Sequence, residues 1–268
     1  DKHPGYQSTI LGKELATNWE VPVVEVQHHK AHFASVLAEH DLFETTTPVL
    51  GVIWDGTGFG DDGMIWGGEV FVYQNHQMNR KVHFEYFDAL AGDKMPKEPR
   101  LSLFSLVNSE VEVEDKFLKG ELKIYQKLKN NSKLKTSSVG RLFDAVASLL
   151  GVSDVTTYEG EAALLLENLA WQYQGECIDL LKGQSFETVP SKTIIEHLIA
   201  LKHQSESKAK LAASFIYTLA RAVIKIARTF EISTIACSGG VFQNRFLVKT
   251  LRDMTRNNGF TLYFNQEV

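Results

Sequence analysis

Short apolar runs rich in β-branched residues alternate along this chain with longer stretches whose apolar residues recur at helical spacing. A run of about four to eight such residues, bounded by turn signals, is typical of a buried strand, whereas recurrence about every three to four residues indicates a helix. Strands are therefore predicted at 21–27, 48–54, 64–73, 81–87 and 232–237. Helices are predicted at 28–39, 110–135, 138–151, 162–181, 207–229 and 242–257. This mixture predicts an α/β fold, with a loop at 88–100 between its two parts.

Composition narrows the class of protein. The chain has 268 residues, 44% hydrophobic and 23% charged, enough for one large domain or two lobes around a cleft. Its net charge of −5 argues weakly against a protein that coats nucleic acid. No apolar run reaches the roughly 18 residues of a membrane span. Because Cys177 and Cys237 form no disulfide framework, we expect a reducing, cytoplasmic location.

Two histidines in the segment VQHHKAHFASVLAEH are the first candidates for chemistry. His28 and His32 are four residues apart in a predicted helix, so both rings lie on one face. Asp55 ends the next predicted strand, and we expect it to be a third ligand because strand ends and helix starts meet at one sheet edge. Two imidazoles and a carboxylate suit a divalent metal, either zinc or ferrous iron. The alternative is that the histidines are ordinary residues of a helix surface.

Two glycine-bearing segments are candidates for holding an anion. DGTGFGDDG brings Gly56, Gly58 and Gly60 close together, although a tight hairpin turn explains that segment alone equally well. CSGGVFQN carries a strand through two glycines into a helix start, where backbone amides and the helix dipole favour an anion or nucleotide. The alternative there is close packing of a strand against a helix. Cys237 reads as a small apolar residue at the strand end.

Six segments together carry a family resemblance. They are HPGYQST, VQHHKAH, WDGTGFGDDGMIWGGE, SSVGRLFDAVASLLG, TYEGEAALLLE and CSGGVFQN, in this order. The combination resembles the C-terminal, Kae1-like domain of the HypF family, carbamoyltransferases that mature nickel–iron hydrogenases. The resemblance covers nearly the whole chain and implies the two-lobed α/β fold of the actin/Hsp70-like (ASKHA) superfamily. It implies an N-terminal lobe at 1–100 and a C-terminal lobe at 101–268, truncated at both ends.

The resemblance also implies a set of site residues. His28, His32 and Asp55 match the family's metal-binding positions, and the family has a further aspartate beyond residue 268. The implied ligand of the cleft is ATP or carbamoyl-adenylate. The residues implied for the nucleotide site are Gly56, Thr57, Gly58, Gly60, Gly140, Asp144, Gly160, Glu161, Gly239, Gly240 and Asn244.

The implied activity is carbamoyl transfer. In the family, an upstream YrdC-like domain forms carbamoyl-adenylate from carbamoyl phosphate and ATP. The Kae1-like domain then passes the carbamoyl group to the C-terminal cysteine of the partner protein HypE. The resemblance implies neither a membrane nor a nucleic-acid partner. The competing hypotheses are a related transferase, acting on tRNA as a threonylcarbamoyl enzyme or on a hydroxyl as an O-carbamoyltransferase, and a catalytically silent nucleotide-binding module.

Overall fold

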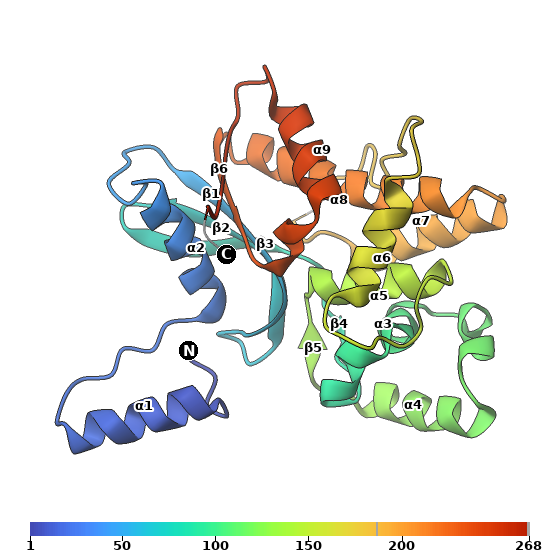
Figure 1. Cartoon of the computed structure of the whole chain (residues 1–268), viewed down its shortest axis with the longest axis horizontal. Helices are drawn as coiled ribbons and strands as arrows, with labels where there is room; N and C mark the ends of the chain where they lie inside the picture. The colour runs from blue at the N-terminus through green and yellow to red at the C-terminus, as the bar shows by residue number, and fades with distance from the viewer. Residues whose placement is uncertain (186, 267–268) are drawn as a thin grey trace.

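The structure is a computed structural model that describes residues 1–185 and 187–266. The fold is built on one mixed sheet (Figure 1). The described strands are β1 (Val49–Phe59), β2 (Ile65–Gln74), β3 (Gln77–His83), β4 (Phe87–Asp88), β5 (Lys135–Thr136), β6 (Thr234–Ser238) and β7 (Thr261–Phe264). Their order is β4-β5-β2-β1-β6-β7, and β3 pairs with β2. The hairpins β1–β2 and β2–β3 are antiparallel, whereas β6 runs parallel to both β1 and β7.

Strand β1 buries both of its faces. Leu50, Val52 and Trp54 enter a large core that also contains helix α5 (Val139–Leu149). Val49 and Ile53 point the other way, into a smaller core with helix α2 (His28–Glu39). Alternate side chains of a strand point to opposite faces, so a strand covered on both sides reads as a continuous apolar run. The predicted strand at 48–54 is confirmed for this reason.

Seven further helices are described. They are α1 (Gln7–Asn18), α3 (Pro99–Leu106), α4 (Lys119–Asn131), α6 (Glu161–Ala170), α7 (Ser191–His203), α8 (Lys208–Thr229) and α9 (Arg245–Thr255). Short 3-10 turns lie between these elements at η1 (Gly92–Lys97), η2 (Glu110–Glu112), η3 (Glu114–Lys116) and η4 (Gly240–Gln243). None of the described helices is both long and apolar enough to cross a lipid bilayer.

Helices with clear caps follow the sequence prediction well. The Gln27 side chain accepts a hydrogen bond from the Lys30 N–H, and α2 begins at His28 as predicted. Ser207 caps α8 in the same way through the Lys210 N–H. Ser138 caps α5, which ends just before Gly151.

The predicted strand at 21–27 is wrong. The segment is extended but joins no strand, and α1 with this segment stands apart from the rest of the molecule (Figure 1). Val24 is 84% exposed, and Val21, Val23 and Val26 are also exposed. β-Branched residues favour extended backbone, but a strand also needs a neighbouring ladder, which the described chain does not provide.

The predicted long helix at 162–181 is also wrong beyond Ala170. The N–H groups of Ile178 and Leu180 donate to the Ser214 and Thr218 hydroxyls of α8, at 3.0 and 2.9 Å, instead of to helical carbonyls. Tertiary hydrogen bonds here override the local helical preference. Within the predicted helix at 110–135, only 119–131 form an α-helix, α4. The predicted loop at 88–100 contains η1 and the start of α3. The elements α1, α7, β5 and β7 were not predicted.

The predicted lobes share one sheet in this structure. Val49 to Ile53 of β1 pair in parallel register with Thr234 to Ser238 of β6. Strands from both sides of residue 100 therefore lie side by side, and the division at that residue stays a prediction.

Candidate metal and nucleotide site

The structure brings the three predicted metal ligands together. His28 and His32 project from α2 towards Asp55, which lies where β1 shifts register against β2 between Trp54 and Gly58. His28 Nε2 and His32 Nε2 lie 3.1 and 3.5 Å from Asp55 Oδ2. All three donor atoms lie within 4.8 Å of one another, and each residue is half-buried. Two imidazole nitrogens and one carboxylate oxygen at this spacing fit a divalent zinc or iron ion.

Asp55 is held as a carboxylate. Burial alone raises the pKa of its carboxyl, but hydrogen bonds from His28, His32 and the Gly56 N–H outweigh burial and hold the pKa well below its usual range. The neighbouring His29 is different: burial lowers the pKa of its imidazole to about 3. Its Nδ1 lies 3.0 Å from the Gln27 amide nitrogen, so this ring belongs to the packing around the cap of α2.

Asp55 also joins three elements of the fold. Its Oδ1 accepts hydrogen bonds from the N–H of Gly56, at 2.8 Å, and from that of Gly240 at the start of η4, at 3.3 Å. The Ser138 hydroxyl, the cap of α5, donates to the Gly56 carbonyl at 2.7 Å. The start of η4 and the start of α5 therefore both hold the Asp55–Gly56 segment in place.

A cavity of about 490 Å³ opens beside this junction. Asp55 and Gly56 form one wall, α5 and α6 form others, and η4 with the start of α9 closes it. The predicted nucleotide residues that line the cavity are Gly56, Gly140, Asp144, Gly160, Gly240 and Asn244. These six residues come from four separate segments of the chain, and the fold brings them together around one cavity.

Several buried polar atoms of residues lining this cavity lack hydrogen bonds. Among the described residues, Asn244 Nδ2, Arg141 Nε and Asp144 Oδ2 are buried without a hydrogen bond. Arg141 Nη1 is within ion-pair distance of Asp144 Oδ2, at 3.1 Å, but is not aligned for a hydrogen bond. Burial raises the pKa of Asp144 to about 7, and the Arg141 charge opposes that shift. Buried polar atoms without hydrogen bonds are costly, so polar groups of a bound ligand would stabilise this cavity.

Arg141 was missed in the sequence analysis as a site residue. It lies inside the quoted segment SSVGRLFD, directly after Gly140. Its side chain is 11% exposed and reaches the cavity from the first turn of α5. A single arginine in the first turn of a predicted helix, next to a glycine, was the available signal, since cations are unfavourable at that end of a helix dipole.

The remaining predicted nucleotide residues lie outside this cavity. Gly239 lines an adjoining cavity of about 410 Å³ together with His32. Thr57 is exposed, Gly58 and Gly60 pack against His29 and Trp66, and the Glu161 carboxylate accepts hydrogen bonds from Thr157. Their role in nucleotide binding stays a prediction.

Two local interpretations need correction. Residues 56–59 form part of strand β1, so the glycine segment is a loop only from Gly60 to Met64. Helix α9 begins at Arg245 and not at the predicted residue 242, so Asn244 is its N-cap residue, and the Asn244 Oδ1 accepts a hydrogen bond from the Leu247 N–H at 2.8 Å. The cap leaves Nδ2 as the group available to a ligand.

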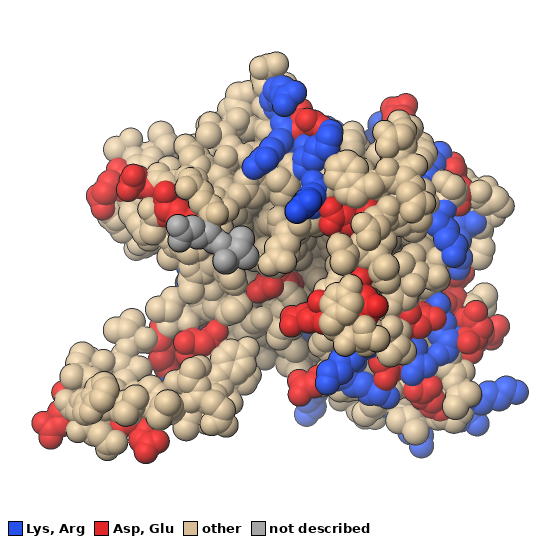
Figure 2. Space-filling view, in the orientation of Figure 1, with Lys and Arg blue, Asp and Glu red and all other residues tan. Residues whose placement is uncertain are grey.

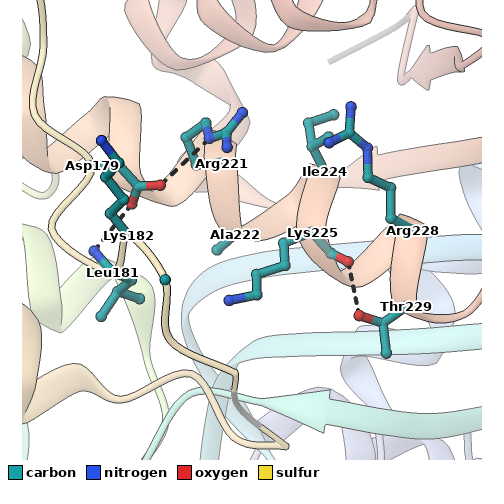
Figure 3. Close-up of a pocket in the computed structure, with 10 residues that line it drawn as sticks. Asp179, Leu181, Lys182, Arg221, Ala222, Ile224, Lys225, Arg228 and Thr229 are labelled. Carbon is teal, nitrogen blue, oxygen red and sulfur yellow. Dashed lines mark hydrogen bonds and ion pairs between the residues drawn. The ribbon is translucent and has the colours of Figure 1, made fainter.

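A separate hollow of about 400 Å³ beside α8 contains none of the predicted site residues (Figure 3). Arg221 faces Asp179 there at 3.5 Å. In Figure 3 the guanidinium groups of Arg221 and Arg228 extend to one side of α8, whereas Lys225 extends to another. Because these cations do not converge on one point, the hollow offers no focused anion site.

Comparisons with known proteins identify the family of this chain. Residues 51–268 match the family model "Carbamoyltransferase, Kae1-like Domain, second subdomain", and residues 1–39 match "HypF Kae1-like domain". The chain is 31% identical, over its whole length, to the probable carbamoyltransferase HypF of Methanocaldococcus jannaschii, and it covers 36% of that protein. It is 32% identical to carbamoyltransferase HypF of Synechocystis, again over all of this chain and 37% of the relative. The chain thus spans about a third of the length of these relatives.

Solved structures show the same similarity. A crystal structure of full-length HypF in a phosphate- and nucleotide-bound form superposes with a TM-score of 0.88 at 30% identity, covering 99% of this chain and 43% of that one. The structure of T. kodakarensis HypF gives a TM-score of 0.83 at 30% identity, covering 98% and 37%. The predicted α/β fold of the ASKHA type is confirmed. The chain belongs to the HypF carbamoyltransferase family, whose Kae1-like domain it matches.

Proposed function

We propose that this chain is the carbamoyl-transfer domain of a HypF enzyme, receiving carbamoyl-adenylate and passing the carbamoyl group to the C-terminal cysteine of HypE. One observation carries the proposal: Asp55 contacts the His28/His32 cluster through Oδ2 and belongs to the wall of the cavity. A candidate metal site and a cavity suited to a nucleotide therefore share one carboxylate. Carbamoyl-adenylate has a phosphate, ribose hydroxyls and a reactive carbonyl for these groups.

The chemistry needs no nucleophile from this chain. In the proposed step, a partner thiolate attacks the carbamoyl carbon, a C–S bond forms, and the bond from that carbon to the phosphate oxygen breaks. AMP leaves with the bonding electrons, and the thiol proton is lost to solvent before attack. Among the described residues, no cysteine lines the cavity with Asp55, and Cys237 is buried. A nucleophile supplied by the partner accounts for this arrangement.

The residues of the chain have positioning roles in this proposal. Arg141 and Asn244 Nδ2 would hold the anionic phosphate, and Asp144 would pair with hydroxyl groups. His28, His32 and Asp55 would hold a divalent ion, which when bound would polarise a carbonyl or phosphate oxygen. Donors that hold the departing phosphate stabilise the charge that develops on it.

A second candidate function rests on a weaker similarity. The chain is 29% identical to the tRNA N6-adenosine threonylcarbamoyltransferase of Neorickettsia sennetsu, over 48% of this chain and 41% of that enzyme. Transfer assays with purified HypE and with tRNA, in parallel, distinguish the two. Transfer to HypE alone supports the proposal, transfer to tRNA supports the alternative, and nucleotide binding without either transfer indicates a silent module.

The metal assignment is tested by His32→Ala. We expect this variant to lose bound metal, measured by elemental analysis, together with carbamoyl transfer, while circular dichroism shows the fold unchanged. His203→Ala is the matched control, because His203 is 63% exposed and pairs with Glu112 away from the cluster. Full metal occupancy in His32→Ala would show that the cluster is not the metal site.

A further inference from the structure

Helix α9 carries a continuous row of cations. Arg245, Lys249 and Arg252 of α9 and its C-cap residue Arg256 are all exposed, and their spacings of four, three and four residues place them along one side of the helix. Figure 2 shows this row as a blue column over α9, beside the hollow at the centre of the molecule. We call these four residues the α9 ridge. The opposite face of the helix is buried through Leu247, Leu251 and Thr255, so packing holds the ridge in place.

The ridge is only partly neutralised. Lys249 pairs with Asp253 on the same helix, and the Arg252 guanidinium lies 5.4 Å above the ring of Phe264. Within the described part of the chain, Arg245 and Arg256 have no carboxylate at ion-pair distance. Like charges spaced four apart on a helix repel, and the chain as a whole has a net charge of −5. A local excess of positive charge in an acidic chain indicates a binding surface for an anion.

The ridge begins at the cavity. Gln243 and Asn244, immediately before Arg245, line its wall. From Arg245 to Arg256 the helix rises about 16 Å, away from that wall. A macromolecule that approaches the cavity along α9 would therefore contact the ridge.

We propose that the α9 ridge docks a carboxylate-rich segment of the acceptor protein and so guides its terminal cysteine towards the cavity. This inference rests on the proposed function, because it concerns the partner of the same site. The occupant is a protein segment because the acceptor in the proposed function is a protein, and carboxylates complement the charge of the exposed row on α9.

The test compares two triple variants with the same change of charge. Arg245→Gln/Lys249→Gln/Arg256→Gln removes the ridge but keeps Arg252 and its contact with Phe264. Lys119→Gln/Lys123→Gln/Lys127→Gln removes three exposed cations of α4, which do not line the cavity. Both triple variants are made in the protein in its natural form, with any further domains that it has. Carbamoyl transfer to purified HypE is measured from low to high salt, along with ATP affinity.

We expect the ridge variant to raise the KM for HypE about tenfold at low salt, with kcat and ATP affinity unchanged. Its KM should also depend less on salt than that of the wild type, because charged contacts are screened. The α4 variant should match the wild type. An unchanged KM in the ridge variant overturns the inference while leaving the proposed function intact, and so does a ridge-dependent binding of tRNA. No transfer to HypE by the wild type overturns the proposed function itself.

Discussion

Replacing Gly239 by alanine tests how the sheet and the site are joined. Gly239 lies between β6 and η4 with φ of 100° and ψ of 162°, a region that is accessible essentially to glycine alone. A Cβ at this position would lie 2.8 Å from the Trp54 carbonyl carbon, and closer still to its oxygen. The neighbour is backbone in the central strand, so it cannot rotate away as a side chain can.

Two unfavourable contributions lower the free energy of unfolding of Gly239→Ala. The disfavoured backbone region costs about 1–3 kcal/mol for a residue with a side chain. Crowding against the β1 backbone costs a further 1–3 kcal/mol or so. The expected loss in the free energy of unfolding is therefore about 2–6 kcal/mol, a large share of the stability of an ordinary domain.

Urea unfolding followed by circular dichroism measures this loss. Gly183→Ala is the control, because Gly183 also has positive φ, at 78°, but no atom lies within 4 Å of an added Cβ. That variant should lose only about 1–2 kcal/mol, from the backbone alone. Equal losses in the two variants would refute the steric argument. Trp54 directly precedes the proposed metal ligand Asp55. Gly239→Ala should therefore also weaken metal binding in those molecules of the variant that remain folded.

Two further predictions follow from buried ionisable groups. Burial raises the pKa of Asp144 from 3.8 to about 7, so the folded protein binds this proton more tightly than the unfolded chain does. Stability should therefore fall by up to about 4 kcal/mol as pH rises from about 4 to 7, and the pH dependence should flatten in Asp144→Asn, as followed by denaturant titration at several pH values. A steeper dependence in the variant would contradict this assignment. Burial also raises the pKa of both thiols, more for the fully buried Cys237 than for Cys177. A thiol reagent should modify Cys177 first in the native protein, as mass spectrometry of digests can show, and early labelling of Cys237 would contradict its buried position.

Local signals predicted those parts of the fold that local physics controls. Apolar residues at helical spacing predicted α2 and α8, and the apolar run at 48–54 marks the central strand because both its faces are covered. The failures have tertiary causes. The hydroxyl groups of Ser214 and Thr218 in α8 accept hydrogen bonds from backbone N–H groups of the segment that was predicted to continue α6. The charged, weakly patterned α7 has no strong cap, since Pro190 precedes it without a side-chain hydrogen bond.

In the candidate site, too, local signals predict one part and miss another. The spacing of His28 and His32 fixes their shared helical face, so their meeting with Asp55 could be predicted from the strand that follows. Arg141 could not be predicted with equal ease, because its importance depends on burial beside Asp144 and on a cavity assembled from distant segments. The family resemblance located that cavity through Gly140, Gly160 and Gly240, but it did not indicate which polar groups are unpaired.

The exposed segment at 21–27 has a practical consequence for handling the protein. It combines four exposed valines with backbone that joins no strand, which is the pattern of an edge prone to intermolecular pairing and aggregation. Pro22 removes one backbone donor, and Glu25, paired with Lys13, places a charge within the run. These two residues act as gatekeepers against self-association. Replacing Glu25 with valine would join the hydrophobic run and should lower the solubility of the chain before it affects the site.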